Sequence, residues 1–248
     1  MPAPGRMNQA KLNLERGTPQ PDMKKMLLFD IDGTLLLTGG TGRIAFERAF
    51  YEIYGIDNSW GHVIPDGKTD QMIFGEIFER HFGQPPRPNE LKNLFIHYAR
   101  HFEKEIDITP GFKIMPGIPD LIRRLSNLSH IALGIATGNI AEVSHYKLRR
   151  ADLHHYFHFM ATASDSHDRP TLVKHAIERG LTLTGPLDTN SIFVIGDAEA
   201  DVHAAKKNGV RSIAVATGST SRQTLQDLQP DYLLDDLSNH ELLFEILG

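Results

Sequence analysis

Residues 26–34, MLLFDIDGT, decide the fold of this 248-residue chain. The stretch begins with apolar residues, as is typical of a strand buried in a parallel sheet, and we expect that strand to span residues 26–30. Two aspartates, Asp30 and Asp32, lie at its end and just beyond it. Because ligands of an open α/β sheet bind beyond the carboxyl ends of its strands, these aspartates are candidates for a functional site.

Further apolar runs predict five more strands. Strong ones span residues 131–136, 192–195 and 212–216, and weaker ones span residues 157–161 and 232–234. Between them apolar residues recur with helical spacing, so that strands and helices alternate along the chain. This alternation predicts an α/β fold with a doubly wound parallel sheet.

A helical block interrupts this alternation. The roughly 100 residues between Asp30 and Ile131 contain no convincing strand, but they contain three amphipathic helical patterns. A single crossover between parallel strands needs only one helix, so most of this block is expected to fold as a separate, small all-helical domain. The predicted parts of the chain are a flexible N-terminal tail (1–22), an α/β core (23–38 and 116–248) and a helical domain (39–115).

Composition excludes several classes of function. The chain has 26 Lys and Arg against 31 Asp and Glu, a net charge of −5, so no overall positive field draws it to nucleic acid or to an anionic membrane. The absence of cysteine excludes disulfides, thiolate-bound zinc, iron–sulfur clusters and a thiol nucleophile. Neither a signal peptide nor a membrane span is visible in the sequence, so a cytoplasmic location is the default expectation.

Polar clusters follow four of the predicted strands. Besides Asp30 and Asp32, they are Thr-Gly-Asn at 137–139, Gly-Asp-Ala-Glu-Ala-Asp at 196–201 and Asp-Arg-Pro at 168–170. Each cluster alone is compatible with a turn or a helix cap. Together they place carboxylates at neighbouring strand ends, where their mutual repulsion requires a cation. An all-oxygen set of ligands favours Mg²⁺ over zinc.

With these motifs in this order, the chain from residue 24 onward resembles the haloacid dehalogenase superfamily of aspartate-based phosphotransferases, which has a Rossmann-like core. The resemblance implies that Asp30 is the catalytic nucleophile and that Asp32 is the general acid and base. It also implies that the Thr137 hydroxyl, with the backbone N–H groups of Gly138 and Asn139, binds the phosphoryl group.

The resemblance further implies a Mg²⁺ site formed by Asp30, Asp197 and the carbonyl of Asp32. Asp201 would support the metal through water or through the direct ligands.

This chain departs from the family's usual pattern at the position of the catalytic cation. Family members usually carry a lysine there, often followed by proline, whereas this chain has Arg169 before Pro170 and Lys174 five residues later. Arg169 is predicted to be the catalytic cation, with Lys174 as the alternative. Arginine would supply the same positive charge, spread over a planar guanidinium group with several N–H donors.

The position of the helical block, between the first and second motifs, resembles the small-substrate branch of the superfamily with an α-helical cap. Within it, residues 66–70, DGKTD, resemble a segment of phosphoglycolate phosphatase-like members. Lys68 is therefore a candidate contact to an anionic substrate. In the alternative interpretation Thr69 caps the following helix and Lys68 is solvated.

These features predict a Mg²⁺-dependent phosphatase that hydrolyses a small phosphomonoester through an aspartyl-phosphate intermediate, with phosphoglycolate as the first substrate to test. The alternatives are a phosphosugar mutase similar to β-phosphoglucomutase and a non-catalytic binding protein on the same fold. The expected partner is a small phosphorylated metabolite, and not nucleic acid or a membrane; the oligomeric state is left open. A metal site at His154, His155 and His158 is conceivable, although a solvated or packing role is favoured.

Overall fold

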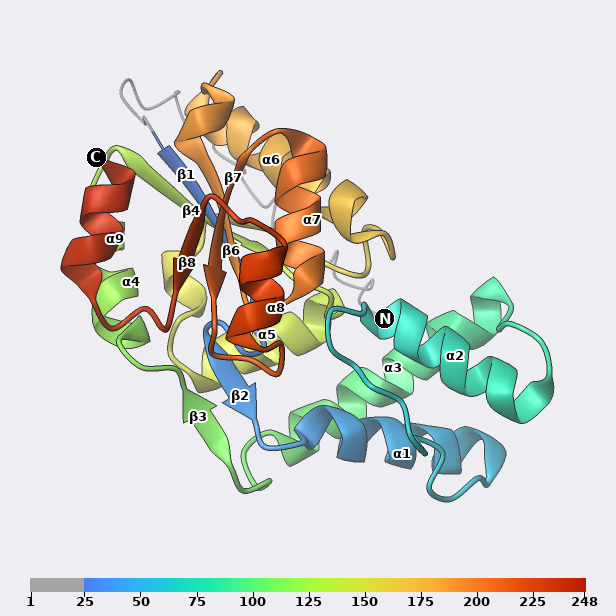
Figure 1. Ribbon diagram of the computed structural model, residues 1–248. Helices are drawn as coiled ribbons and strands as arrows, with labels where there is room; N and C mark the ends of the chain where they lie inside the picture. Colours follow the sequence, from blue (N-terminus) through green and yellow to red (C-terminus); the bar gives the residue numbers. More distant parts are fainter. Residues whose placement is uncertain (1–24) are drawn as a thin grey trace, which may run out of the picture.

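The computed structural model describes residues 25–248, which fold around a six-stranded sheet in which every pairing is parallel (Figure 1). The predicted tail, residues 1–22, lies outside the described residues. From one edge to the other, the strands are β5 (Phe159–Ala161), β4 (Ile131–Ala136), β1 (Lys25–Phe29), β6 (Ile192–Gly196), β7 (Arg211–Val215) and β8 (Tyr232–Leu234). All six predicted strands are present, and the predicted doubly wound parallel sheet is confirmed.

Helices cover both faces of this sheet. Leu27 and Phe29 of β1 belong to one core cluster with residues of α4 (Ile118–Ser126) and α9 (His240–Leu247). Met26 and Leu28 belong to another cluster with residues of α6 (Arg169–Thr184) and α7 (Glu199–Asn208), two helices on the other face of the sheet (Figure 1). Since neither face meets water, the strands are almost wholly apolar, which is why their sequence runs were recognisable. The helices and 3₁₀ turns of this part are α4 (Ile118–Ser126), α5 (Ala141–Arg150), η1 (His154–Tyr156), α6 (Arg169–Thr184), η2 (Thr189–Ser191), α7 (Glu199–Asn208), α8 (Arg222–Asp227) and α9 (His240–Leu247).

The strand order creates a crevice at the centre of the sheet. The chain passes from β1 outward to β4 and β5 on one side, then returns to the other side of β1 for β6, β7 and β8. The connections after β1, β4 and β6 therefore diverge from three adjacent strands, and this is where open α/β sheets bind their ligands.

The helical block packs over this end of the sheet around an aromatic core. The ring centroids of Phe46 and Phe74 lie 4.4 Å apart, and those of Phe74 and Tyr98 lie 5.1 Å apart, both edge-on. Such pairs add about 0.5–1.5 kcal/mol each to the gain from burial. The same cluster includes Ile140 and Val143 from the start of α5, so the block is packed against the core. Its helices are α1 (Thr41–Tyr54), α2 (Asp70–Phe82) and α3 (Pro88–Glu105).

The prediction of no strand between Asp30 and Ile131 is wrong. Leu36–Thr38 (β2) and Phe112–Ile114 (β3) pair antiparallel in a separate two-stranded ribbon. Three residues are too few for an alternating pattern to stand out, and the pairing joins segments that are far apart in sequence. The ribbon forms the two connections between the helical block and the sheet (Figure 1). The domain boundaries at residues 39 and 115 remain a prediction.

None of the helices within residues 25–248 combines the length and the apolar character required to span a bilayer.

Asp70, the first residue of α2, ties the helical block to the connection after β4. Its backbone N–H donates to the Gly138 carbonyl at 2.7 Å, and its Oδ2 accepts from the Ile140 N–H at 2.8 Å. Asp70 is buried, and burial raises the pKa of its carboxyl from 3.8 to about 7, although the nearby Lys147 ammonium acts in the opposite direction. An ionised Asp70 therefore lowers the stability of the folded protein.

Asp70→Asn should become progressively more stable than the wild type as the pH rises. Folded Asp70 keeps its proton up to about pH 7, whereas the unfolded chain releases it near pH 4, so wild-type stability falls across this window. Asparagine keeps an acceptor for the Ile140 N–H and carries no charge. Urea unfolding should show the variant gaining on the order of 2 kcal/mol over the wild type between about pH 5 and pH 8.

Asp120→Asn, at an exposed position of α4, serves as the control and should show a difference from wild type that varies little with pH. A difference for Asp70→Asn that is the same at both pH values would contradict the assignment of a raised pKa to this group.

Candidate active site

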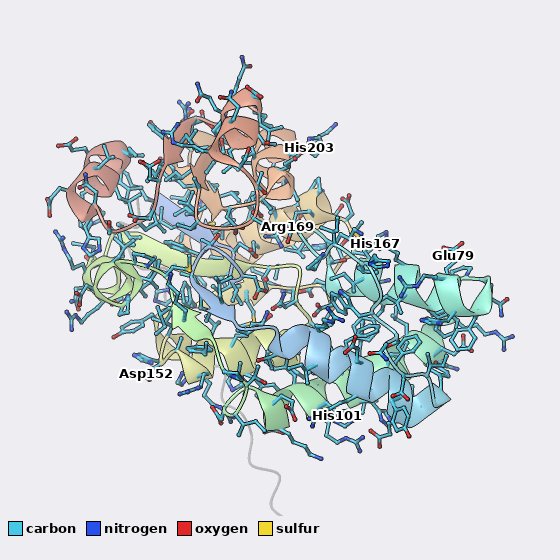
Figure 2. The ribbon with its side chains drawn as sticks, turned by 60° about the horizontal axis from the view of Figure 1, so that its bottom comes forward. Glu79, His101, Asp152, His167, Arg169 and His203 are labelled. Carbon is cyan, nitrogen blue, oxygen red and sulfur yellow. The ribbon has the colours of Figure 1, made fainter. Side chains whose placement is uncertain are left out.

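Asp30 and Arg169 form the centre of the candidate site. Asp30 follows β1 directly, and Arg169 opens α6 after Asp168, whose side chain accepts from the Thr171 N–H and caps the helix. The Arg169 guanidinium lies 2.8 Å from Oδ1 of Asp30 and 2.6 Å from Oδ1 of Asp201, and all three side chains are largely buried. Figure 2 shows Arg169 at the junction of the sheet and the helical block.

The two candidates for the cationic position lie in different surroundings. Arg169 contacts the predicted nucleophile, whereas Lys174 lies on the exposed side of α6, 3.9 Å from Glu178. The structure therefore brings Arg169 to Asp30 and leaves Lys174 outside the site.

Asp197, which follows β6, is held in a closely fitting position. Its Oδ1 accepts from the Thr34 hydroxyl at 2.8 Å. A Cβ atom at Gly33 would lie 2.4 Å from Oδ2 of Asp197, and one at Gly218 would lie 1.7 Å from the same oxygen. Glycine is required at position 33 for a second reason, since its φ of +78° lies in the left-handed region. These contacts fix the Asp197 carboxylate beside Asp30.

Asp30, Asp197 and Asp201 form a buried cluster, with carboxylate oxygens within 4.8 Å of one another. Burial raises the pKa of Asp30 to about 6, with Arg169 acting in the opposite direction. Burial, followed by the charge of Asp30, raises the pKa of Asp197 to about 8. The single guanidinium thus leaves negative charge uncompensated. Because the donors are all oxygens, the cluster fits a hard divalent cation such as Mg²⁺.

Asp32 lies across the site in a more open position. Its side chain is 40% exposed, accepts from Asn139 Nδ2 at 2.9 Å and contacts the Lys147 ammonium at 2.5 and 2.7 Å. The environments of Asp30 and Asp32 are therefore different, which is a condition for two carboxylates to have different chemical roles.

The 137–139 motif follows β4 on the same edge of the sheet. Thr137 is fully buried, and its hydroxyl oxygen accepts from the Asn139 N–H at 3.4 Å. A Cβ atom at Gly138 would lie 2.7 Å from the Lys68 carbonyl, so this residue lies directly against the segment that precedes α2. Oδ1 of Asn139 is buried and has no hydrogen-bond partner among the described residues. All three residues line the same cavity as Asp30.

This cavity lies between the sheet and the helical block and has a volume of about 300 Å³. All the predicted site residues border it: Asp30, Asp32, Lys68, Thr137, Gly138, Asn139, Arg169, Asp197 and Asp201.

A family model described as haloacid dehalogenase-like hydrolase matches residues 27–215, which include every one of these residues. The chain belongs to this family.

Individual relatives are similar over different lengths. The pyrophosphatase PpaX of Oceanobacillus iheyensis is 23% identical over 218 residues, 87% of this chain and 94% of the relative. The phosphoglycolate phosphatase of Synechococcus elongatus is 29% identical over 133 residues, 54% of this chain and 60% of the relative. The structure of CbbY from Rhodobacter sphaeroides in complex with phosphate has a TM-score of 0.69 at 22% identity, over 88% of this chain and 96% of that one. This structural likeness shows the shared fold.

Two residues that line the cavity of this haloacid dehalogenase-like hydrolase were given no role from the sequence. Lys147 is buried on the inner side of α5, beside Val143 and Leu148, and contacts Asp32. A lysine at the helical spacing of the buried residues Val143, Ser144 and Leu148 is a signal that could have identified it. Asp70 gave a weaker signal, because an acidic residue in the first turn of a helix is common for reasons of helix stability alone.

The segment before α2 combines features of both interpretations of its sequence. The Thr69 hydroxyl accepts from the Met72 N–H and caps α2. Lys68 borders the cavity and pairs with Glu76, nearly two turns into the helix. A contact between Lys68 and the substrate remains a prediction.

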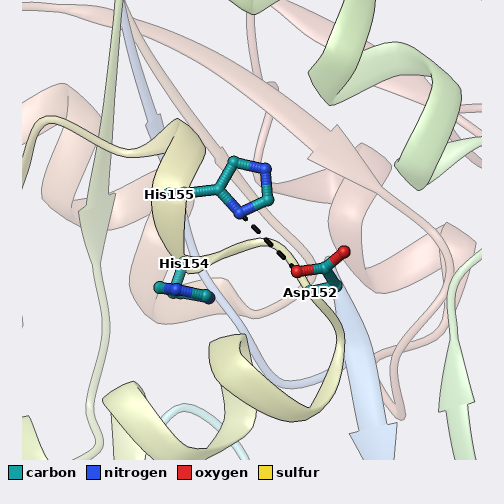
Figure 3. Close-up of side chains that lie close together, drawn as sticks. All are labelled: Asp152, His154 and His155. Carbon is teal, nitrogen blue, oxygen red and sulfur yellow. Dashed lines mark ion pairs between the residues drawn. The ribbon is translucent and has the colours of Figure 1, made fainter.

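Of the three clustered histidines, two lie near an aspartate on the surface (Figure 3). Asp152, His154 and His155 are all exposed, and His155 Nδ1 lies 3.7 Å from Asp152 Oδ1. His158, just before the edge strand β5, instead contacts the backbone of Leu133 in β4. No role in the candidate site follows for this cluster, because it does not border the cavity.

Asp197→Asn provides a test of the metal site that does not depend on activity. Near neutral pH without divalent ions, the variant should melt at a higher temperature than the wild type. Asp197 must take up a proton on folding at this pH, whereas asparagine is neutral in both states and keeps an acceptor for Thr34. Excess Mg²⁺ should raise the melting temperature of the wild type by several degrees, roughly 2–4 °C per kcal/mol of binding energy, and that of the variant much less.

A wild-type melting temperature that is the same in EDTA and in excess Mg²⁺ would contradict the metal site. An Asp197→Asn variant that is less stable than the wild type in EDTA would contradict the inference that Arg169 leaves the carboxylates of this cluster uncompensated.

Proposed function

We propose that this haloacid dehalogenase-like hydrolase is a Mg²⁺-dependent phosphatase that hydrolyses a small phosphomonoester through an aspartyl phosphate on Asp30. The observation that carries the proposal is the pairing of buried Asp30 with Arg169, opposite Asp32 in one partly open cavity. The relatives named as phosphoglycolate phosphatase and pyrophosphatase support hydrolysis at phosphorus.

In the first step a carboxylate oxygen of Asp30 attacks phosphorus, and the bond from phosphorus to the leaving oxygen breaks. Asp32, protonated at this stage, donates its proton to the leaving oxygen, which departs as an alcohol. In the second step Asp32 takes a proton from water as that water attacks the phosphoaspartate. The Asp30–phosphorus bond then breaks, inorganic phosphate is released, and Asp32 is protonated again for the next cycle.

Arg169 and Asp32 are each positioned for these roles by a second contact. Asp201 binds the Arg169 guanidinium from behind, which directs it at Asp30 and at the charge that develops on the phosphoryl oxygens. Asn139 and Lys147 hold the Asp32 carboxylate on the leaving-group side. Thr137, with the backbone of Gly138 and Asn139, would hold a phosphoryl oxygen.

Asp30, Asp197 and the Asp32 carbonyl would hold the Mg²⁺, with Asp201 supporting the site. When bound, the ion offsets the negative charge shared by these carboxylates and the phosphoryl group.

We propose that α1, α2 and α3, within residues 39–115, act as the cap over this site. They close the cavity opposite Asp30, and Asp70 joins them to the loop that holds Thr137. A cap in this position excludes bulk water from the reaction and selects the leaving group. Residence in the cytoplasm, with a small phosphorylated metabolite as substrate, is part of the same proposal.

A phosphate-release screen over small phosphorylated metabolites tests the function. Activity should require Mg²⁺ and disappear in EDTA, and free phosphate should appear in step with substrate loss. Arg169→Ala should lower kcat by about 10²–10³, since it removes the cation that contacts Asp30. Lys174→Ala, on the exposed side of the same helix, is the matched control and should keep wild-type activity.

A loss of activity in Lys174→Ala with retention in Arg169→Ala would transfer the catalytic role to Lys174. Isomerised product without released phosphate would replace the phosphatase with a mutase.

A further inference from the structure

A second group of potential metal ligands lies on the surface, where α5 ends and η1 begins (Figure 3). Asp152, His154 and His155 each offer one ligand atom there, and these three atoms lie within 4.8 Å of one another. None of the three residues borders the cavity of the candidate active site, and Asp152 lies well apart from Arg169 in Figure 2. This group is therefore separate from the carboxylate cluster around Asp30.

The backbone that carries these side chains is fixed by the core. Leu153, which follows Asp152, is buried in a core cluster of the sheet, and Tyr156 packs against the same cluster. The Leu153 N–H donates to the Leu148 carbonyl at 2.8 Å, across the last turn of α5. Because the backbone is fixed while the three side chains are exposed, their ligand atoms can close around an ion by side-chain rotation alone.

Asp152 occupies a position where a carboxylate does not favour the helix. Its φ of +55° lies in the left-handed region just beyond the end of α5, where glycine is the usual residue. A negative charge there also opposes the helix macrodipole, whose C-terminal end is itself negative. The two arginines that end α5 are engaged elsewhere, since Arg150 pairs with Asp107 at 3.1 Å and Arg149 lies over a tyrosine ring. The stability of α5 therefore does not explain a charge at this position.

The ring nitrogens of His154 and His155 are available to an ion. Within residues 25–248 neither ring takes part in a hydrogen bond, and Asp152 is the only charged group within ion-pair distance of either. His158 differs, because the backbone of Leu133 engages its Nδ1. Imidazole nitrogen together with a carboxylate is a ligand set typical of zinc, whereas Mg²⁺ prefers oxygen alone.

The separations between these atoms suit a tetrahedral ion. Zinc binds imidazole nitrogen and carboxylate oxygen at about 2.0–2.2 Å, so two tetrahedral ligands of one ion lie about 3.4 Å apart. His155 Nδ1 and Asp152 Oδ1 are 3.7 Å apart, which is close to this value. Three protein ligands leave the fourth position of the tetrahedron to water.

We propose that Asp152, His154 and His155 form a binding site for Zn²⁺, with water as the fourth ligand. The ion places positive charge at the negative end of the α5 macrodipole and joins α5 to η1, so it stabilises the folded protein. The proposal does not depend on the phosphatase function, because it uses no residue of the cavity.

A calorimetric titration with Zn²⁺ tests the site. The full-length protein, without an affinity tag, is stripped of metal with EDTA, dialysed, and titrated in excess Mg²⁺, which occupies the carboxylate cluster. His154→Gln and His155→Gln should each weaken Zn²⁺ binding at least about tenfold, because each removes one of three protein ligands. Zn²⁺ should raise the melting temperature of the wild type and should not raise that of the double variant.

Asp152→Asn tests the carboxylate. Asparagine tolerates the left-handed backbone, so the variant should fold as the wild type does. It should bind Zn²⁺ more weakly, and without zinc it should melt no lower than the wild type, because the charge at the end of α5 is gone.

His175→Gln is the matched control. His175 Nδ1 lies 3.4 Å from Glu178 on α6, with the same three-residue spacing as Asp152 and His155. This pair does not belong to a group of three ligand side chains among the described residues, so Zn²⁺ binding by the variant should equal that of the wild type.

Equal Zn²⁺ binding by the wild type and by the double variant of His154 and His155 would overturn the proposal. An equal loss of binding in His175→Gln would overturn it too, because binding would then be spread over the surface histidines. Undiminished binding by Asp152→Asn would overturn the role of the carboxylate.

Discussion

The burial of three carboxylates around a single arginine is the constraint on which the site depends. Asp30, Asp197 and Asp201 come together at the ends of β1 and β6, and Arg169 reaches two of them from the start of α6. Removing one charged group from water costs several kcal/mol unless it is paired, so three carboxylates cannot be held this closely for stability alone. The raised pKa values of Asp30 and Asp197 show that Arg169 does not fully compensate them. This uncompensated charge is what a divalent cation would neutralise.

The rest of the structure holds this cluster and limits what can reach it. Close contacts with Gly33 and Gly218 leave the Asp197 carboxylate little freedom to turn away from Asp30. On the other side of the cavity, Lys147 fixes Asp32, while the hydrogen bonds of Asp70 fix the helical block against the loop after β4. The contacts that hold the helical block against the sheet thus also hold the reacting groups on the two sides of the cavity.

Much of this could be predicted from sequence because the strong signals are local. The strands were visible as apolar runs, since both faces of the sheet are covered, and Asp30, Thr137 and Asp197 follow strands directly. The ribbon of β2 and β3 was not visible, because each strand has three residues and its partner lies far along the chain. The roles of Lys147 and Asp70 could not be predicted for a related reason. Their contacts, Asp32 and Ile140, lie 115 and 70 residues away in the sequence.

The central claim is that Asp30 becomes phosphorylated during turnover. Borohydride reduces an acyl phosphate to an alcohol and leaves a free carboxylate unchanged, so quenching the enzyme with it during turnover marks the phosphorylated residue. Mass spectrometry of the peptide that begins near Met26 should find homoserine in place of Asp30 when substrate and Mg²⁺ are present. Asp30→Asn should give no reduced product at this position. Steady turnover without reduction at Asp30, or with reduction at Asp32 instead, would contradict the account.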